Sequence, residues 1–137
     1  MVQPGFPAGL GSVWARRVDA GWEYGLALAA DHANPAGKVH GGVLLALADH
    51  ALSLVAWQAA GRVPCATIQL SMQFLRPVEP EGFLRARGEV VRLTGSLVFM
   101  RGILTASDGA EVAAADGIWR TQRAGIAGAA DPGRVTE

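Results

Sequence analysis

The longest apolar pattern in the chain lies between residues 40 and 60. Its aliphatic and aromatic side chains are spread around almost the whole circumference of a helix, and a helix that is apolar on nearly all sides is usually buried. Gly61 is well placed to end this helix, and Pro64 prevents it from resuming. The pattern therefore predicts one long helix in the core.

Alternating apolar and polar residues predict five strands. One strand precedes the helix at residues 22–29, and four follow it at 65–74, 83–93, 96–107 and 111–121. The pair Asp108 and Gly109 is typical of a tight hairpin, so we expect a meander linked mostly by hairpins. Strict alternation along 65–74 separates two sets of side chains on opposite faces: Ile68, Leu70, Met72 and Phe74 against Thr67, Gln69, Ser71 and Gln73.

The order of these elements indicates an α+β domain in which an antiparallel sheet wraps around one central helix. Such a sheet covers the helix on one side only. We expect the opposite side to contact a second copy of the chain, because burial favours a partner there. Residues at spacings of three and four place small side chains on one narrow helix face: Gly42, Ala46, Asp49, Ser53, Ala56 and Ala60.

The expected domain spans residues 21–121. Residues 1–20 are interpreted as a flexible or loosely docked N-terminal segment, because the first 11 residues are rich in Gly and Pro. Residues 12–19 have a mixed pattern that is compatible with a short extended or helical piece. The last segment, 122–137, is rich in Ala, Gly and small polar residues and is expected to fray.

A chain of 137 residues is the size of a single domain. Twelve basic residues balance twelve acidic ones, which argues against nucleic acid as a partner. We find neither an uninterrupted apolar run of about 18 residues nor a signal peptide, and we expect a soluble, cytoplasmic protein without a membrane partner. The lone Cys65 excludes an internal disulfide and a cysteine-based zinc cluster, and we expect no metal and no cofactor.

Candidate chemistry gathers at the start of the long helix, in the stretch NPAGKVHGGVLLALAD from Asn34 to Asp49. A polar turn leads there into the helix, and Gly41 lies where backbone N–H groups have no partner within the helix. Such groups, aided by the helix dipole, stabilise an oxygen that becomes negative. Asp49 follows in an apolar setting, where partial desolvation makes an ionised carboxylate a stronger base. Water attack on an activated carbonyl is the simplest reaction that uses both groups.

The spacing of His40 and Asp49 indicates that two chains build each site. Nine residues of helix correspond to about 900° of rotation and about 13 Å of rise, so the two residues point to opposite sides. Gly41 and Asp49 of one chain cannot easily reach the same substrate. Two antiparallel helices from two subunits would form two equivalent sites, each combining the helix start of one subunit with the aspartate of the other.

Each of these residues also has an ordinary structural interpretation. An aspartate in a helix is usually solvated, and Gly41 with Gly42 can simply permit close packing. His40 at a helix start often caps the helix or holds a loop. Asn34 before a proline is typical of a turn, and Thr67 is typical of a strand. The combination is more specific than any single member.

The residues Asn34, Pro35, Gly37, His40, Gly41, Gly42 and Asp49 together resemble the motif of the hotdog-fold acyl-CoA thioesterases of the phenylacetic-acid type (PaaI-like). The resemblance covers residues 20 to 121, including the strand TIQLSMQFLRP and the order of elements. It implies a hotdog fold, an acyl-CoA substrate, and a homodimer that further assembles into a tetramer.

The resemblance also implies roles for individual residues. Gly41 would polarise the thioester carbonyl through its N–H, and Asp49 of the other subunit would act as general base or nucleophile. Asn34 would orient the water or intermediate, and Thr67 would assist the water in place of the Ser or Thr that family members often carry there. His40 matches the motif and would order the loop beside the carbonyl site.

Two other functions remain possible at this stage. Hotdog enoyl-CoA hydratases carry a D-x-N-P-x-H motif, which Asp31 and His40 echo at nine residues apart where the motif needs five. A non-catalytic acyl-CoA-binding or sensing module on the same fold is the second. The side chains available for the CoA phosphates are Arg62, Arg76, Arg85, Arg87 and Arg92, each of which is more typically a solvated surface residue.

Overall fold

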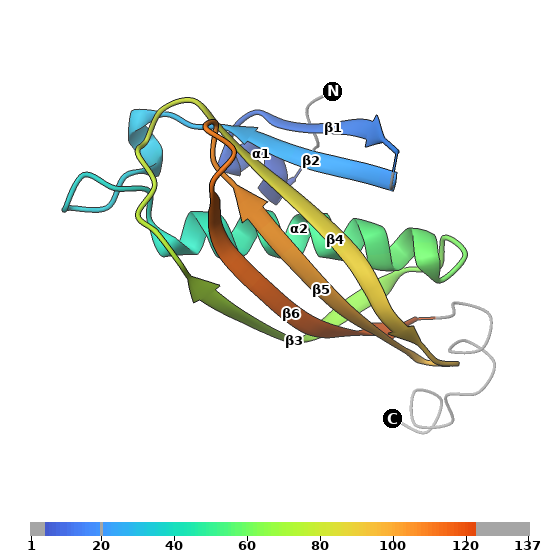
Figure 1. The fold of residues 1–137 in the computed structure, drawn as a ribbon. Helices are drawn as coiled ribbons and strands as arrows, with labels where there is room; N and C mark the ends of the chain where they lie inside the picture. The colour runs from blue at the N-terminus through green and yellow to red at the C-terminus, as the bar shows by residue number, and fades with distance from the viewer. Residues whose placement is uncertain (1–4, 20, 123–137) are drawn as a thin grey trace, which may run out of the picture.

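The computed structural model describes residues 5–19 and 21–122 (Figure 1). Two α-helices, a short 3-10 helix and six strands follow one another along these residues. In chain order the elements are α1 (Phe6–Leu10), β1 (Val13–Val18), β2 (Gly21–Ala27), the 3-10 helix η1 (Ala30–His32), α2 (Gly41–Ala59), β3 (Cys65–Phe74), β4 (Phe83–Leu93), β5 (Leu97–Thr105) and β6 (Glu111–Thr121).

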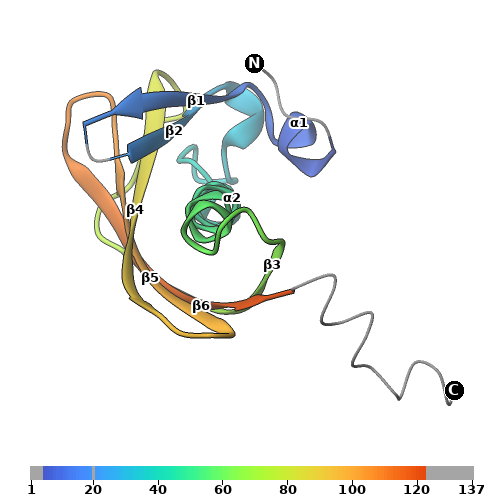
Figure 2. The same cartoon turned by 90° about the vertical axis from the view of Figure 1, so that its right-hand side faces the viewer.

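The six strands form one antiparallel sheet in the order β1-β2-β4-β5-β6-β3. Viewed along the helix axis, the sheet curls around α2 on one side (Figure 2). This arrangement confirms the expected α+β architecture, with the long helix in the concave side of the sheet.

The core lies between α2 and the concave face of the sheet. Leu47 and Leu52 of α2 are almost completely buried, as are Leu84 of β4 and Trp119 of β6. Full burial of one such side chain stabilises the fold by about 1.5–3 kcal/mol. The side of α2 that faces the sheet therefore supplies the helix's part of the core.

The helix α2 is also long and apolar enough to span a membrane by length and composition, with a hydropathy of 1.3. Core helices of globular domains often have the same length and apolar composition. Here the sheet packs against α2 and buries Leu44, Leu47 and Leu52, but only 33% of the apolar window is buried, so the core accounts for one side of the helix.

The predicted four-strand meander is only partly correct. β4, β5 and β6 pair in succession, but β3 pairs with the outer edge of β6 and has no contact with β4 in the sheet order. Residues 75–82 carry the chain across the end of the sheet, and the Val39 N–H donates to the Val78 carbonyl at 2.8 Å on the way. Local alternation identifies a strand but not its neighbour, which explains the error.

The sheet begins earlier than the expected domain start at residue 21. β1 pairs with β2 over six residues, and Val13 at its start is only 1% exposed. Strand β1 is therefore part of the sheet and not a loosely docked segment, while α1 contacts both β1 and α2. Residues 1–4 and 123–137, which include nearly all of the tail expected to fray, lie outside the described residues.

The small-residue face of α2 is only partly free, contrary to the expectation that all of it faces a partner. Ala56 is 0% exposed, and Ser53 accepts a hydrogen bond from the Trp119 indole Nε1 at 2.9 Å. Gly42 is exposed, and Ala46 and Asp49 are partly exposed. In the second half of this face Ala56 is buried, while Ser53 and Ala60 are partly exposed.

Glu23 of β2 joins three strands on the outer face of the sheet. Its carboxylate is buried and accepts hydrogen bonds from Arg16 of β1 and Arg87 of β4, each at 2.7 Å. Burial alone would raise the pKa of Glu23, but the two arginines outweigh burial and lower the pKa below its ordinary 4.5. The charged pair of arginines thus stabilises the ionised carboxylate in the folded state.

Replacing Leu52 by alanine should lower the free energy of unfolding by about 2–5 kcal/mol, because it leaves a cavity in the core. The Leu52 side chain fills the space above Gly88 and Gly102. Urea denaturation at a fixed protein concentration measures the loss. Leu93→Ala is the matched control, since Leu93 is 48% exposed and its loss should cost far less. Equal losses for both variants would contradict this account of the core.

The ionised Glu23 should make the free energy of unfolding dependent on pH in the acidic range. Its contribution is complete above pH 4.5 and is lost as the pH falls through the lowered folded-state pKa. Wild type should therefore be more stable than Glu23→Gln at neutral pH, and the difference should shrink as the pH falls below 4.5. Denaturation curves at several pH values measure this. Glu111→Gln, at an exposed position of β6, is the control, and a pH-independent difference for Glu23→Gln would refute the prediction.

Candidate active site

His40 caps the start of α2 and leaves one backbone donor free. Its ring Nδ1 accepts the Gly42 N–H at 2.9 Å, and its carbonyl accepts the Val43 N–H at 2.9 Å. The Gly41 N–H, which precedes these two, has no acceptor in the part of the chain that the structure describes. It lies at the positive end of the helix dipole, where a negative oxygen is stabilised.

The turn before the helix is held by Asn34. Its backbone N–H donates to the Lys38 carbonyl at 2.6 Å, and its side-chain Oδ1 accepts the Lys38 N–H at 3.0 Å. Gly37 adopts a φ of 82°, in the left-handed region that favours glycine. The turn-forming interpretation of Asn34 is thus correct. Its side-chain NH₂ group has no acceptor among the described residues and is available as a donor.

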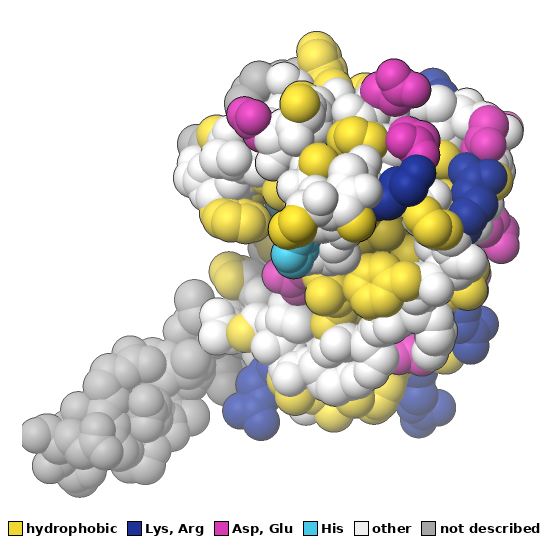
Figure 3. Space-filling model, turned by 90° about the vertical axis from the view of Figure 1, so that its left-hand side faces the viewer, with side chains coloured by type: hydrophobic (Ala, Val, Ile, Leu, Met, Phe, Trp, Pro, Cys, Tyr) yellow, Lys and Arg dark blue, Asp and Glu magenta, His cyan; other side chains and the backbone are white. Residues whose placement is uncertain are grey.

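Asn34 and Gly41 open onto one cavity of about 380 Å³. A methyl group added at Gly41 would lie 3.3 Å from Cε1 of Phe74, so a larger residue at position 41 would be crowded. The view from the side of the helix start shows hydrophobic side chains gathered in the middle of this face, beside a histidine (Figure 3). The lining residues are Asn34, Lys38, Val39, Gly41, Leu44, Phe74, Leu75, Arg76, Pro77 and Val78.

Asp49 and Thr67 form a second group, two turns further along α2. The Thr67 hydroxyl donates to Asp49 Oδ1 at 2.6 Å, and both side chains are accessible to solvent. Neither residue lines the cavity at Gly41. His40 is the cap and lies outside the helix, so the separation between the two groups is counted from Gly41 to Asp49. These two residues are eight positions apart, which corresponds to about 12 Å of rise and a net rotation of about 80°. The axial rise, more than the rotation, separates the two groups within one chain.

A model of the thioesterase superfamily matches residues 36–113, which is more than half of the chain and includes Gly41, Asp49 and Thr67. The chain belongs to the thioesterase superfamily. Its motif and its six-stranded sheet around one helix make it a PaaI-like protein of the hotdog fold. A search of curated proteins finds no match.

Solved structures of similar proteins share the whole architecture. The TT0310 protein from Thermus thermophilus is 26% identical, with a TM-score of 0.77 over 88% of this chain and 99% of that chain. A mutant of the phenylacetic acid degradation protein PaaI from the same organism is also 26% identical, with a TM-score of 0.76 over 85% and 98%. The BH2602 protein from Bacillus halodurans, solved with CoA, is 23% identical, with a TM-score of 0.70 over 79% and 71%.

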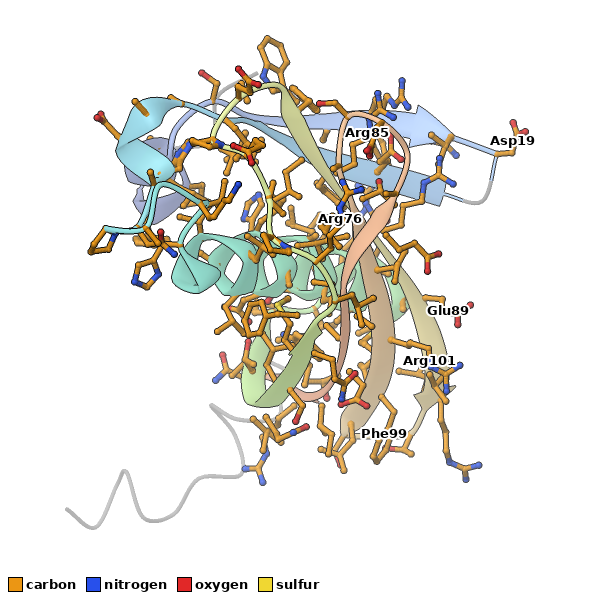
Figure 4. All side chains as sticks on the ribbon, turned by 60° about the vertical axis from the view of Figure 1, so that its left-hand side comes forward. Asp19, Arg76, Arg85, Glu89, Phe99 and Arg101 are labelled. Carbon is orange, nitrogen blue, oxygen red and sulfur yellow. The ribbon has the colours of Figure 1, made fainter. Side chains whose placement is uncertain are left out.

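The arginines of this superfamily member occupy different surroundings. Arg76 alone among the five candidates lines the cavity at Gly41, and it pairs with Asp108 at 3.1 Å. Arg87 is bound to Glu23, and Arg62 stacks on the Trp57 ring at 5.5 Å. Figure 4 shows Glu89 and Arg101, which pair at 3.5 Å, on the outside of the sheet away from the helix. Both side chains of this pair are exposed, so it contributes little to stability.

Two features of the site escape sequence reasoning. Alternation groups Phe74 with Leu70 and Met72 on one face of β3, but does not show that Phe74 is 53% exposed and forms a wall of the cavity. His50, next to Asp49, directs its buried Nε2 to no partner among the described residues and packs its ring edge against Tyr24 at 6.1 Å. Burial lowers the pKa of His50, so the neutral form is favoured. No local pattern distinguishes these residues from ordinary core residues.

Replacing His40 by alanine should lower the free energy of unfolding by about 0.5–2 kcal/mol, because the Gly42 N–H loses its acceptor. His40→Asn should restore most of the loss, since asparagine is a favoured cap. Thermal or urea denaturation of the three proteins measures the effect. Unchanged stability in the alanine variant would show that the ring does not act as a cap.

Proposed function

We propose that this protein hydrolyses an acyl-CoA thioester, with an aryl or medium-chain acyl group, to the free acid and CoA. The observation that carries the proposal is the capping of α2, which leaves the Gly41 N–H free beside a cavity lined by both polar and apolar residues. A thioester carbonyl bound to this N–H becomes more electrophilic, and the negative oxygen of the tetrahedral intermediate is stabilised by the helix start.

Asp49 and Thr67 supply the second half of the proposed reaction. Asp49 accepts a proton from water as the water oxygen attacks the thioester carbon. In a nucleophilic route Asp49 attacks that carbon itself, and water then hydrolyses the mixed anhydride left after loss of the CoA thiolate, which releases the free acid and restores the Asp49 carboxylate. In both routes the C–S bond breaks, and the CoA sulfur leaves as a thiolate that takes up a proton. Support for the pairing comes from the Thr67 hydroxyl, which already donates to Asp49. The free NH₂ group of Asn34 is suited to orient the water or the intermediate beside Gly41.

Each proposed site is shared between two subunits. Within one chain, about 12 Å of helix separates Gly41 from Asp49, which is too far for one thioester carbonyl and its attacking water. Strand β3 is the last strand of the sheet, so its outer edge is unpaired among the described residues. Exposed edges of this length favour pairing with another chain. We propose an antiparallel dimer in which Asp49 and Thr67 of one protomer complete the Gly41 site of its partner, with further assembly to a tetramer.

The substrate assignment follows from the cavity and from the relatives. One part of the cavity wall is apolar and includes Leu44, Phe74 and Val78, which suits an apolar acyl group, and the polar part includes Asn34, Lys38 and Arg76. CoA is the ligand of the BH2602 structure, which shares this fold. Arg76 is the arginine nearest to the cavity and is therefore a candidate contact for a CoA phosphate.

Asp49→Asn should lower kcat for thioester hydrolysis by about 10²–10⁴ while folding is retained, because the proton acceptor is lost. Thiol release from a panel of aryl- and acyl-CoAs measures turnover. The matched control is Asp116→Asn, at an exposed position of β6. Near-normal hydrolysis by Asp49→Asn would refute the assignment, and CoA binding by wild type without thiol release would favour a binding module.

Mixed dimers test whether two chains build each site. Asp49→Asn and Asn34→Ala should each be nearly inactive alone. If the sites are shared, randomly mixed protomers should recover roughly a quarter of wild-type activity, because half of the dimers then contain one intact site of two. No recovery after confirmed subunit exchange would place Asn34 and Asp49 of one chain in the same site.

A further inference from the structure

Strand β3 contains a β-bulge next to Thr67. Thr67 pairs with Trp119, but Gln69 pairs with Ile118, so Ile68 is an extra residue with no partner of its own on β6. Beyond the bulge, Leu70 and Met72 face the helix opposite the buried Gly117 and Ala115. A bulge changes the face on which the preceding side chains lie, because it inserts one residue into the alternation.

The bulge decides the direction of Thr67. Strict alternation would place Thr67 with Gln69 on the outer face of the sheet. Instead, Thr67 lies opposite Trp119, which is 0% exposed and faces the helix. Thr67 therefore faces α2 and reaches Asp49 at 2.6 Å, while Ile68 is left 52% exposed. Without the bulge, an isoleucine would face the helix in this region and the threonine would point away.

Two residues of β6 accommodate the bulge. A methyl group added to Gly117 would lie 2.5 Å from the backbone oxygen of Gln69 and 2.8 Å from Cζ3 of Trp119. Both distances are shorter than real contacts allow, and the first involves backbone that cannot rotate away. The Gln69 carbonyl and the Trp119 ring thus share the space that Gly117 leaves empty.

Trp119 also ties this part of the sheet to the turn of the helix that carries Asp49. Its Nε1 donates to Ser53 Oγ at 2.9 Å. Ser53 follows Asp49 by four residues and therefore lies on the same side of α2, one turn further along. This hydrogen bond links Trp119 of β6 to the turn of α2 that follows Asp49.

We propose that Gly117 and Trp119 are positioning residues for the site, because they maintain the bulge that turns Thr67 towards Asp49. This inference rests on the proposed thioesterase function, in which the Thr67 hydroxyl assists the water held by Asp49. Neither residue touches the substrate. They act through Thr67, whose hydroxyl must face α2 to reach Asp49.

The test compares Gly117→Ala with Gly102→Ala. Both are buried strand glycines, and a methyl group at Gly102 would lie 3.0 Å from Cδ2 of Leu52 and 3.1 Å from the Arg87 backbone oxygen, away from the bulge. Gly117→Ala should lower kcat roughly tenfold to a hundredfold with little change in KM, as expected for a lost hydrogen bond to a charged group. Gly102→Ala should retain kcat. Equal loss of kcat in both variants would overturn the proposal.

A double-mutant cycle separates positioning from general damage. If Gly117 acts through Thr67, then Gly117→Ala should lower kcat no further once Thr67→Val has removed the hydroxyl. Trp119→Phe provides a second variant should Gly117→Ala fold poorly, and it should show the same dependence on Thr67. Additive losses for both variants would overturn the proposal.

A crystal structure of the Gly117→Ala variant tests the inference without any assay. Thr67 should then lie beyond hydrogen-bond distance of Asp49, and an intact Thr67–Asp49 bond would overturn the inference. If wild type hydrolyses no thioester at all, the proposed function fails. The crystal structure of the variant still shows whether Gly117 is needed for the bulge and for the Thr67–Asp49 hydrogen bond.

Discussion

The burial of α2 in the curve of a single sheet is the constraint on which the rest of the structure depends. The sheet approaches the helix from one side, and its glycines at positions 88 and 102 leave room for the side chain of Leu52. The helix is thereby fixed along the concave surface of the sheet. Its capped start lies beside the turn of Asn34, and the carboxylate lies two turns on, above β3.

This placement divides the site chemistry into two groups that one chain keeps apart. The first group is the free Gly41 N–H with the Asn34 amide, and the second is Asp49 with Thr67. His40 both caps the helix and shapes the first group. Its ring accepts the Gly42 N–H and its carbonyl accepts the Val43 N–H, so the Gly41 N–H stays free. The structure thus gives the histidine of this motif a capping role, through the hydrogen bond from the Gly42 N–H to its ring.

The edge position of β3 connects the fold to assembly. Because β3 follows the helix but pairs with β6, Thr67 lies at the rim of the sheet, where a second chain can approach. The same edge strand contains the bulge at Ile68. Sheet order and bulge together determine which side chains lie between the helix and the rim, and hence what a neighbouring subunit would meet.

Much of the fold could be predicted from the sequence alone, and so could the unpaired backbone donor at Gly41. The core helix, five of the strands and the free donor at Gly41 follow from local rules: helical and strand periodicity, breaking residues and the unpaired amides of a helix start. The motif from Asn34 to Asp49 also indicated the family, which the comparison confirmed.

The remainder depends on contacts between residues far apart in the chain, and only the tertiary structure decided it. Strand order placed β3 beside β6, and β1 joined the sheet although its sequence showed no clear alternation. The hydrogen bond of Ser53 to Trp119 required β6 to lie beside the helix. The direction of Thr67 is the clearest case: alternation pointed it outwards, and a bulge accommodated by Gly117, far along the chain in β6, turned it to the aspartate. The alternation of apolar and polar residues predicts which face of the sheet a side chain occupies. A bulge shifts that alternation by one residue, and the position of the bulge depends on the strand with which the segment pairs.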